Sequence, residues 1–284
     1  MVKVILQAGD LHIPLATRKH EEFKTILSLF IEQIKDIVSQ YEKDEVILCL
    51  CGDTVDSKNN TSNDLYLFMA WFFRELDSIG CEVITIFGNH DGDFANTSKT
   101  NTLEPIFKVL DLKNVVLLDM ELGYKSGNYI SRSDKNVVFH LYSIFEDYKE
   151  PDIELYKINN PNEHAIHIGL FHGSVIASET DSKFALTSGV SLEIFEPNDL
   201  VLMSDIHRRS FFNYKNTILA YPGSITCLNF GENISKKGFL EWNIEDHKNI
   251  TYEEHDIVSD YGYYKFKANS LEEIVEGTEE FINF

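Results

Sequence analysis

The sequence has few basic side chains for its length. It carries 25 lysines and arginines against 46 aspartates and glutamates among 284 residues, which gives a formal net charge of −21. A chain of this sign is repelled by a phosphate backbone unless metal ions or a local basic patch intervene. The composition therefore argues against a free-standing nucleic-acid-binding protein, and any interaction with DNA needs a local source of positive charge.

The sequence also lacks paired cysteines and long apolar runs. Its four cysteines form no CxxC pair, and Cys49 and Cys51 alternate with leucines in a strand-like run. We expect buried thiols in a reducing cytoplasm, because this spacing does not suit a structural zinc site. No apolar run is long enough to cross a bilayer. The stretch Met1–Ala8 resembles a buried strand and lacks the basic start of a signal peptide, so we expect a cytoplasmic protein without membrane association.

Apolar runs and helical patterns alternate over the first ninety residues. Buried strands are predicted over Val2–Ala8, Glu45–Cys51 and Glu82–Phe87, because each is a short and nearly continuous apolar stretch. Amphipathic helices are predicted between them, over Glu21–Tyr41 and Ser62–Ile79, the second with a serine as N-cap. This alternation is typical of a parallel α/β unit.

The predicted helix Ser62–Ile79 is apolar on more than one face. Its large apolar residues are Leu65, Phe68, Met69, Trp71, Phe72, Phe73 and Leu76. A helix of this kind has to be covered on two sides. Either it lies deep in the core, or its outer face is a partner surface such as a homodimer seam.

Short strands at close spacing follow in the second half of the chain. We expect them to form a second sheet packed on the first, with helices outside, so the predicted fold class is α/β with two packed mixed sheets in a four-layer α+β arrangement. The expected strands are Val115–Leu118, Val137–Ser143, Ala165–Phe171, Leu200–Met203, Thr217–Ala220 and Gly238–Trp242, extended by Thr251–His255. A strand at Tyr261–Lys267 and a helix at Ser270–Phe284 suggest a small appended domain that is cut short or minimal.

Five clusters of acidic and histidine residues each follow an apolar run. They are Gly9-Asp10-Leu11-His12, Gly52-Asp53-Thr54-Val55-Asp56, Gly88-Asn89-His90-Asp91, His172-Gly173 and Ser204-Asp205-Ile206-His207. Loops at strand ends converge in α/β folds, so these side chains are expected to lie close together. Asp, Asn and His are ligands that suit Mn, Fe or Zn. One such cluster is an ordinary polar loop, but five in succession indicate a metal centre.

The supply of ligands fits two metal ions better than one. The expected ligands are Asp10, His12, Asp53, Asn89, His172, Asp205 and His207. Asp53 can bridge two ions with its two oxygens, and Asn89 offers a neutral oxygen. Two metals about 3.5–4 Å apart stabilise both the attacking and the leaving oxygen of a phosphoryl displacement. The set therefore predicts phosphoester chemistry.

His90 follows Asn89 directly and is predicted to act beside the phosphate without being a ligand. It could brace negative charge or protonate the leaving oxygen. Asp56 is placed to hold the His90 ring, because carboxylates beside metal sites commonly orient histidines. His90 and Asp56 are thus the candidate catalytic residues.

The order of the five clusters resembles the calcineurin-like metallophosphoesterase superfamily, over roughly residues 3–245. The resemblance implies a two-sheet sandwich flanked by helices and a dimetal centre of two Mn²⁺, with Mg²⁺, Fe or Zn as alternatives. It implies that His90 is the catalytic histidine and that two metals share Asp53. One metal would take Asp10, His12, Asp53 and His207, and the other Asp53, Asn89, His172 and Asp205.

A narrower resemblance lies in the C-terminal half. The segments Asp199–Arg209, Ala220-Tyr221-Pro222-Gly223-Ser224, Asn229-Phe230-Gly231-Glu232 and Lys237-Gly238-Phe239 are similar to those of SbcD-type DNA repair nucleases of the meiotic recombination eleven family. That family implies a Mn-dependent nuclease with 3'-5' double-strand exonuclease and single-strand endonuclease activity. It implies a nuclease domain over 1–258 and a partial or minimal DNA-capping domain over 259–284.

The same family implies the partners of the chain. They are DNA, an SbcC-type ABC ATPase with a coiled coil, and a second copy bound through the helix Ser62–Ile79 and the helix near Asn101–Leu110. Such complexes work in the bacterial cytoplasm or nucleoid, and the compact chain also fits a phage-encoded protein. Candidate DNA contacts are Arg208, Arg209, Lys215 and Lys183.

One departure from the family lies in the fifth cluster. Relatives usually have Gly-His-x-His where this chain has Ser204-Asp205-Ile206-His207. Aspartate still ligates Mn, so metal affinity is expected to persist. Two other functions stay open: a dimetal enzyme acting on a phosphoprotein or nucleotide, and a non-catalytic scaffold with this fold.

Overall fold

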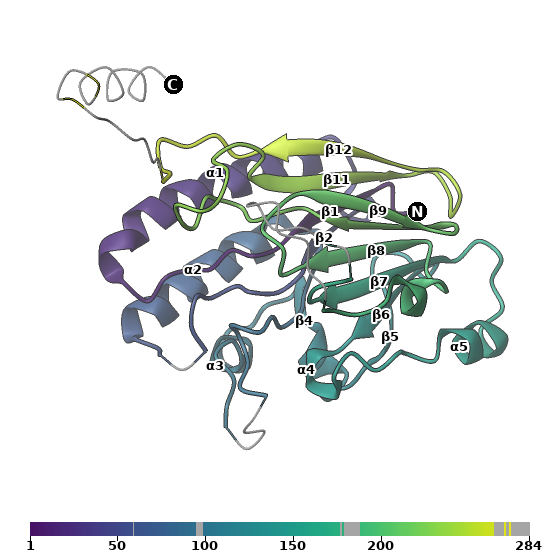
Figure 1. Ribbon diagram of the computed structural model, residues 1–284. Helices are drawn as coiled ribbons and strands as arrows, with labels where there is room; N and C mark the ends of the chain where they lie inside the picture. The colour runs from purple at the N-terminus through teal and green to yellow at the C-terminus, as the bar shows by residue number, and fades with distance from the viewer. Residues whose placement is uncertain are drawn as a thin grey trace.

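The computed structural model describes residues 1–58, 60–94, 99–176, 178, 188–263, 270 and 273. Two six-stranded mixed sheets pack face to face and form the centre of the molecule (Figure 1). Sheet 1 has the order β12-β11-β1-β2-β3-β4. Its strands are β1 Val4–Ala8, β2 Val46–Leu50, β3 Glu82–Thr85, β4 Val115–Leu117, β11 Gly238–Ile244 and β12 Ile250–Asp256.

Sheet 2 has the order β5-β6-β7-β8-β10-β9. Its strands are β5 Gly127–Ile130, β6 Val137–Tyr142, β7 Ile166–His172, β8 Leu200–Ser204, β9 Ser210–Tyr214 and β10 Thr217–Tyr221. Each sheet contains four parallel strands. In sheet 1 the antiparallel strands β11 and β12 both lie on the β1 side, and in sheet 2 β5 and β9 lie at opposite edges. The predicted fold class, two packed mixed sheets flanked by helices, is confirmed.

The alternation of side chains along the strands builds three hydrophobic clusters, one between the sheets and one on the outer face of each sheet. In β1, Val4 and Leu6 face the helices, whereas Ile5 faces sheet 2. In β8, Leu202 faces sheet 1 and Val201 points to the opposite side. Because neighbouring residues of a strand point to opposite faces, strands that are apolar throughout have to be covered on both sides.

Helices α1 (His20–Val38) and α2 (Asn63–Ile79) cover the outer face of sheet 1 (Figure 1). The Ser62 hydroxyl caps α2 by accepting a hydrogen bond from the Leu65 N–H at 3.1 Å, and Gly80 ends the helix with φ 89°. Most large apolar residues of α2 are buried, Phe72 completely, so the helix contributes mainly to the core. Leu67, by contrast, is 70% exposed.

Shorter helices complete the described chain. They are α3 Glu104–Val109, α4 Leu118–Glu121 and α5 Ile153–Asn159, with 3-10 turns at Thr17–Lys19, Lys43–Glu45, Ile144–Glu146 and Leu192–Phe195. Within the described residues, no helix combines the length and the apolar character needed to span a membrane.

The division of strands between the sheets differs from the prediction. Val115–Leu117, Gly238–Ile244 and Ile250–Asp256 belong to sheet 1, not to the second sheet. The β11–β12 hairpin pairs antiparallel with β1 and closes an edge that the parallel unit would leave open. The edge strands β5 and β9 were not predicted; both are only partly buried.

The appended C-terminal domain stays a prediction. The expected strand Tyr261–Lys267 and helix Ser270–Phe284 lie outside the described residues, apart from 261–263, 270 and 273.

Candidate metal centre

The five clusters meet at one end of the sandwich. Asp10 and Asp53 lie in the loops after the neighbouring parallel strands β1 and β2, and Asn89 follows β3. His172 is the last residue of β7, and Asp205 follows its neighbour β8. Parallel strands have their carboxyl ends at the same end of a sheet, and the carboxyl ends of both sheets contribute to the site here. The structure therefore brings all of the predicted ligands together.

Asp53 lies between two groups of donor atoms. Its Oδ2 is 3.5 Å from Nε2 of His12, and its Oδ1 is 3.3 Å from Nε2 of His172. The side chain is only 3% exposed. One carboxylate thus presents one oxygen to each group, which is the arrangement of a ligand shared by two ions.

The first group contains Asp10, His12 and His207, whose ligand atoms lie within 4.8 Å of one another. Nε2 of His12 and Nε2 of His207 are 3.1 Å apart. Nδ1 of His207 donates to the carboxylate of Glu232 at 2.9 Å, so the lone pair of the neutral ring is on Nε2. Two nitrogens bound at about 2.1 Å to one ion at nearly a right angle lie about 3 Å apart. A divalent cation therefore fits between these two rings.

The second group is built around His172. Its Nδ1 donates to the carbonyl of Cys51 at 2.8 Å, which leaves the Nε2 lone pair of the neutral ring facing the cluster. Around Nε2 lie the side-chain amide of Asn89 at 3.0 Å and Oδ1 of Asp205 at 3.9 Å. Without a cation the amide satisfies this cluster by turning its nitrogen toward His172 and both oxygens of Asp53, whereas a bound cation would take its oxygen. The donor set therefore fits a second divalent ion.

Strained backbone positions several of these side chains. Asp10, His12, Asp53 and Asp205 all have positive φ, at 50°, 46°, 52° and 101°. A non-glycine residue in this region carries a conformational cost, which clusters at functional sites. Gly88 has no room for a side chain, because a Cβ there would lie 2.1 Å from Oδ1 of Asp53. The glycines of the motifs thus allow the loops to approach closely.

The electrostatics of the cluster favour a cation. Burial raises the pKa of Asp10 to about 6, against the opposing effect of His207 and His172. Burial lowers the pKa of His12 to about 3, so this ring is neutral and able to ligate at neutral pH. Burial also disfavours the charged form of His172, but the carboxylate of Asp53 outweighs it and raises the pKa to about 10. In the metal-free site a proton on His172 offsets the buried carboxylates.

His90 stands beside the first group, and a donor atom of its ring lies within 4.8 Å of donor atoms of His12 and Asp56. Its ring centroid is 4.8 Å from that of His12, and its Nδ1 donates to the backbone carbonyl of Asp56 at 2.7 Å. The carboxylate of Asp56 is 59% exposed and lies 3.9 Å from Nδ1 of His12. The expected contact is therefore corrected: the carbonyl of Asp56, not its carboxylate, holds the His90 ring.

Asp91 belongs to the third cluster, but its role was not predicted from the sequence. Its carboxylate is fully buried and accepts hydrogen bonds from the N–H groups of Thr54, Val55 and Gly88 at 2.9–3.2 Å. Burial raises the pKa of Asp91 to about 7. Asp91 ties the second cluster to the third, and its place directly after His90 was the available signal.

The basic residues proposed for DNA contact occupy different environments. The Arg209 side chain is 3% exposed and pairs with Glu254 at 2.9 Å and Asp256 at 2.8 Å, so its guanidinium is used inside the protein. This position does not fit the expected phosphate contact. Lys215 is exposed beside the carboxylate of Glu196. Arg208 is partly buried, and Lys183 lies outside the described residues.

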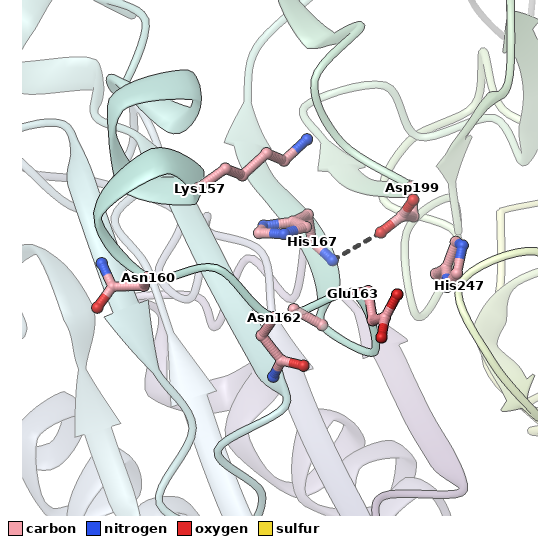
Figure 2. A pocket seen from close by; sticks show the side chains of 8 residues that line it. Lys157, Asn160, Asn162, Glu163, His167, Asp199 and His247 are labelled. Atoms are coloured by element: carbon pink, nitrogen blue, oxygen red, sulfur yellow. Dashed lines mark hydrogen bonds between the residues drawn. The ribbon is translucent and has the colours of Figure 1, made fainter.

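A separate polar cavity of about 340 Å³ lies at the amino-terminal ends of β7 and β8, whereas the candidate metal centre lies at their carboxyl-terminal ends (Figure 2). There the backbone N–H of His167 donates to the carboxylate of Asp199 at 2.8 Å. Nδ1 of His167 lies 2.9 Å from Nε2 of His140. Its lining is Lys157, Asn160, Asn162, Glu163, Ala165, His167, Asp199 and His247. No expected metal ligand is among these residues.

Comparison with known proteins bears on this geometry. Residues 3–209 match the family described as Calcineurin-like phosphoesterase. The chain is 31% identical over 268 residues to "Uncharacterized protein R555" of Acanthamoeba polyphaga mimivirus, covering 92% of this chain but 18% of that protein. The chain thus spans under a fifth of the length of that curated relative.

Solved structures of low sequence identity resemble the fold. The Plasmodium protein described as "GAP50 the anchor in the inner membrane complex" has a TM-score of 0.51 at 12% identity, over 90% of this chain and 89% of that one. A dimetal phosphatase from Danio rerio has a TM-score of 0.49 at 11% identity, over 88% and 98% of the two chains. The family match extends over most of the chain and includes all five clusters. The protein belongs to the calcineurin-like phosphoesterase family.

Proposed function

We propose that this chain is a dimetal phosphodiesterase that cleaves DNA, a Mn²⁺-dependent nuclease of the SbcD type. The observation that carries the proposal is the position of Asp53, with one carboxylate oxygen toward His12 and the other toward His172. The two ions would share Asp53. The first would be held by Asp10, His12, Asp53 and His207, and the second by Asp53, Asn89, His172 and Asp205.

The roles of the residues follow from their contacts. Two divalent cations held there would supply positive charge that stabilises the attacking and leaving oxygens of a phosphoryl displacement. The Nδ1 proton of His90 is held by the Asp56 carbonyl, so Nε2 faces the site. There it accepts a hydrogen bond when the ring is neutral, and it donates a proton to a leaving oxygen when the ring is an imidazolium.

The nuclease assignment rests on the segment after the fifth cluster. Gly223 of the Tyr221–Ser224 turn has φ 81°, and the Ser224 N–H donates to the carbonyl of His207 at 3.2 Å. This turn therefore packs against a predicted metal ligand, where it can shape the substrate path. An SbcC-type ATPase, DNA and a second copy of the chain are the proposed partners. Because the chain has a net charge of −21, such partners and the bound metals would supply much of the attraction for phosphate.

One observation favours a different substrate. Arg209, beside the fifth cluster, pairs with two carboxylates of β12, which removes a cation from the set proposed for DNA. A phosphoprotein or nucleotide needs fewer backbone contacts than a duplex. A non-catalytic scaffold is the third candidate, and the convergence of the donor atoms argues against it.

A substrate panel tests the proposal. Purified protein with Mn²⁺ would be given linear duplex DNA labelled at its 3' end, circular single-stranded DNA, bis-(p-nitrophenyl) phosphate, a cyclic nucleotide and a phosphoprotein. We expect cleavage of both DNA substrates, abolished in Asp53→Asn. Hydrolysis of the nucleotide or phosphoprotein with DNA left intact would replace the nuclease with the second candidate, and inactivity on every substrate would favour the scaffold.

A further inference from the structure

The carboxylate of Glu232 joins a predicted metal ligand to a buried lysine. Its Oε1 accepts a hydrogen bond from Nδ1 of His207 at 2.9 Å, and its Oε2 lies 2.9 Å from Nζ of Lys237. The side chains of Glu232 and Lys237 are 6% and 4% exposed. An ion pair is therefore buried directly behind the ring of His207.

Lys237 holds more than the carboxylate. Its Nζ also donates to the backbone carbonyl of His207 and to the hydroxyl of Ser224, both at 3.0 Å. The ammonium group has thus replaced its water shell with fixed acceptors from three segments of the chain. Because one of them is the backbone of His207, Lys237 positions both the main chain of this ligand and, through Glu232, its ring.

Glu232 has further fixed donors around it. The amide of Asn229 donates to Oε1 at 2.7 Å, and the N–H of Leu228 donates to Oε2 at 3.1 Å. A buried carboxylate in such contacts stays ionised and has little rotational freedom. The ring of His207 consequently has one orientation and one tautomer, with its Nε2 lone pair toward His12.

The ring of His172 lacks this support. Its Nδ1 donates to the carbonyl of Cys51, a neutral acceptor, at 2.8 Å. A carboxylate on the distal nitrogen makes an imidazole a stronger ligand than a carbonyl does, since it stabilises positive charge on the ring. The first group also has two ring nitrogens, whereas Asp205 makes the second group richer in oxygen. The two groups of donors are therefore chemically unequal.

We propose that Glu232 and Lys237 are positioning residues that make the His207 group the tighter of the two metal sites. This inference rests on the proposed dimetal centre but not on the identity of the substrate. Neither residue touches the substrate or the reacting atoms. Loss of one partner would leave the other charged and unpaired behind a ligand, which is strongly unfavourable for a buried ion.

Titration of the metal-free protein with Mn²⁺ by calorimetry, without substrate, tests the proposal. We expect two binding steps in the wild type. Glu232→Gln keeps the shape and an acceptor for His207 but removes the charge, and should weaken the tight step by about 10–100-fold while the weak step is unchanged. Lys237→Met should weaken the same step. In a His172→Ala background the tight step should remain and should still respond to Glu232→Gln.

Glu82→Gln is the matched control. Glu82 is also buried and accepts hydrogen bonds from fixed donors, the hydroxyls of Tyr129 at 2.9 Å and Ser131 at 2.6 Å, but it is the first residue of β3 and lies at the strand end remote from the predicted ligands. We expect wild-type Mn²⁺ binding for this variant. If Lys237→Met does not fold, as judged by circular dichroism, Glu232→Gln carries the test. Equal Mn²⁺ binding by Glu232→Gln and Glu82→Gln, loss in the weak step, or one class of equal sites in the wild type would each overturn the inference. Failure to cleave DNA would overturn only the nuclease assignment.

Discussion

The backbone carbonyl of Asp56 accepts a hydrogen bond from Nδ1 of His90 at 2.7 Å. A carbonyl can only accept, so the Nδ1 atom carries the proton and Nε2 faces whatever occupies the site. The ring of His90 also contacts that of His12 edge to face, with centroids 4.8 Å apart. His90 is therefore held at the border of the metal centre by the main chain, and the exposed carboxylate of Asp56 is not needed for its orientation.

His90→Gln should separate metal binding from catalysis. We expect Mn²⁺ binding by calorimetry to be retained, because the ring is not among the predicted ligands. Phosphodiester cleavage should fall by about 10²–10⁴-fold, the usual contribution of a positioned acid or base. The exposed His164 is a control, and His164→Gln should leave both properties unchanged. Loss of one metal equivalent in His90→Gln would place the ring among the ligands instead.

Arg209→Gln should lower the free energy of unfolding and leave DNA binding unchanged. The Arg209 guanidinium is buried and contacts Glu254, Asp256 and the carbonyl of Pro222. Loss of hydrogen bonds to charged groups costs about 1.5–3 kcal/mol, measured as the free energy of unfolding in urea. The surface pair of Lys215 and Glu196 is the contrast, because Lys215→Gln should cost about 1 kcal/mol or less. An unchanged unfolding curve with weaker DNA binding would restore Arg209 as a phosphate contact.

Leu67 offers a test of the predicted homodimer. This residue is 70% exposed on α2, whereas Phe72 on the same helix is fully buried. If α2 forms the dimer seam, the wild type should be a dimer by sedimentation and Leu67→Asp a folded monomer. Phe72→Asp should unfold the protein in either case, because it places a charge in the core. A wild type that is already monomeric at micromolar concentration would remove the seam from the proposal.

Asp119 should make stability depend on pH. Burial raises its pKa from the ordinary 3.8 to about 6, although the Phe87 N–H and the Ser143 hydroxyl both donate to it at 2.9 Å. The folded state therefore binds more protons than the unfolded state between pH 3.8 and 6. The contribution of Asp119 to the free energy of unfolding is complete below pH 3.8 and is lost as the pH rises through 6. At about 1.4 kcal/mol per pKa unit, the loss amounts to about 3 kcal/mol.

Urea unfolding with a chelator at pH 4, 5.5 and 7 measures this dependence. The stability of the wild type relative to Asp119→Asn should fall by up to about 3 kcal/mol from the lowest pH to the highest. Asn keeps an acceptor for Phe87 and a donor for Ser143 but does not titrate. A constant difference across these pH values would show that Asp119 is ionised throughout.

The apolar runs were sufficient to predict the first parallel unit. The runs of β1, β2 and β3 appear in the sequence because strands covered on both faces need apolar residues at every position. The edge strand β9 escaped prediction because it is only partly buried. Which sheet received β11 and β12 could not be inferred locally, since an antiparallel edge strand pairs equally well with any open edge.

The candidate site also has features that the sequence predicts and features that only the tertiary structure decides. The sequence alone was sufficient to predict the identity and order of the candidate ligands, because Asp, Asn and His at strand ends are the side chains that suit such metals. Asp53 as the shared ligand was likewise an expectation from its two oxygens. Only the tertiary structure decided that the carbonyl of Asp56 holds His90, that Arg209 is paired internally, and that Glu232 and Lys237 stand behind His207. These contacts join residues from separate loops, and their distances depend on how the sheets pack, which no local pattern encodes.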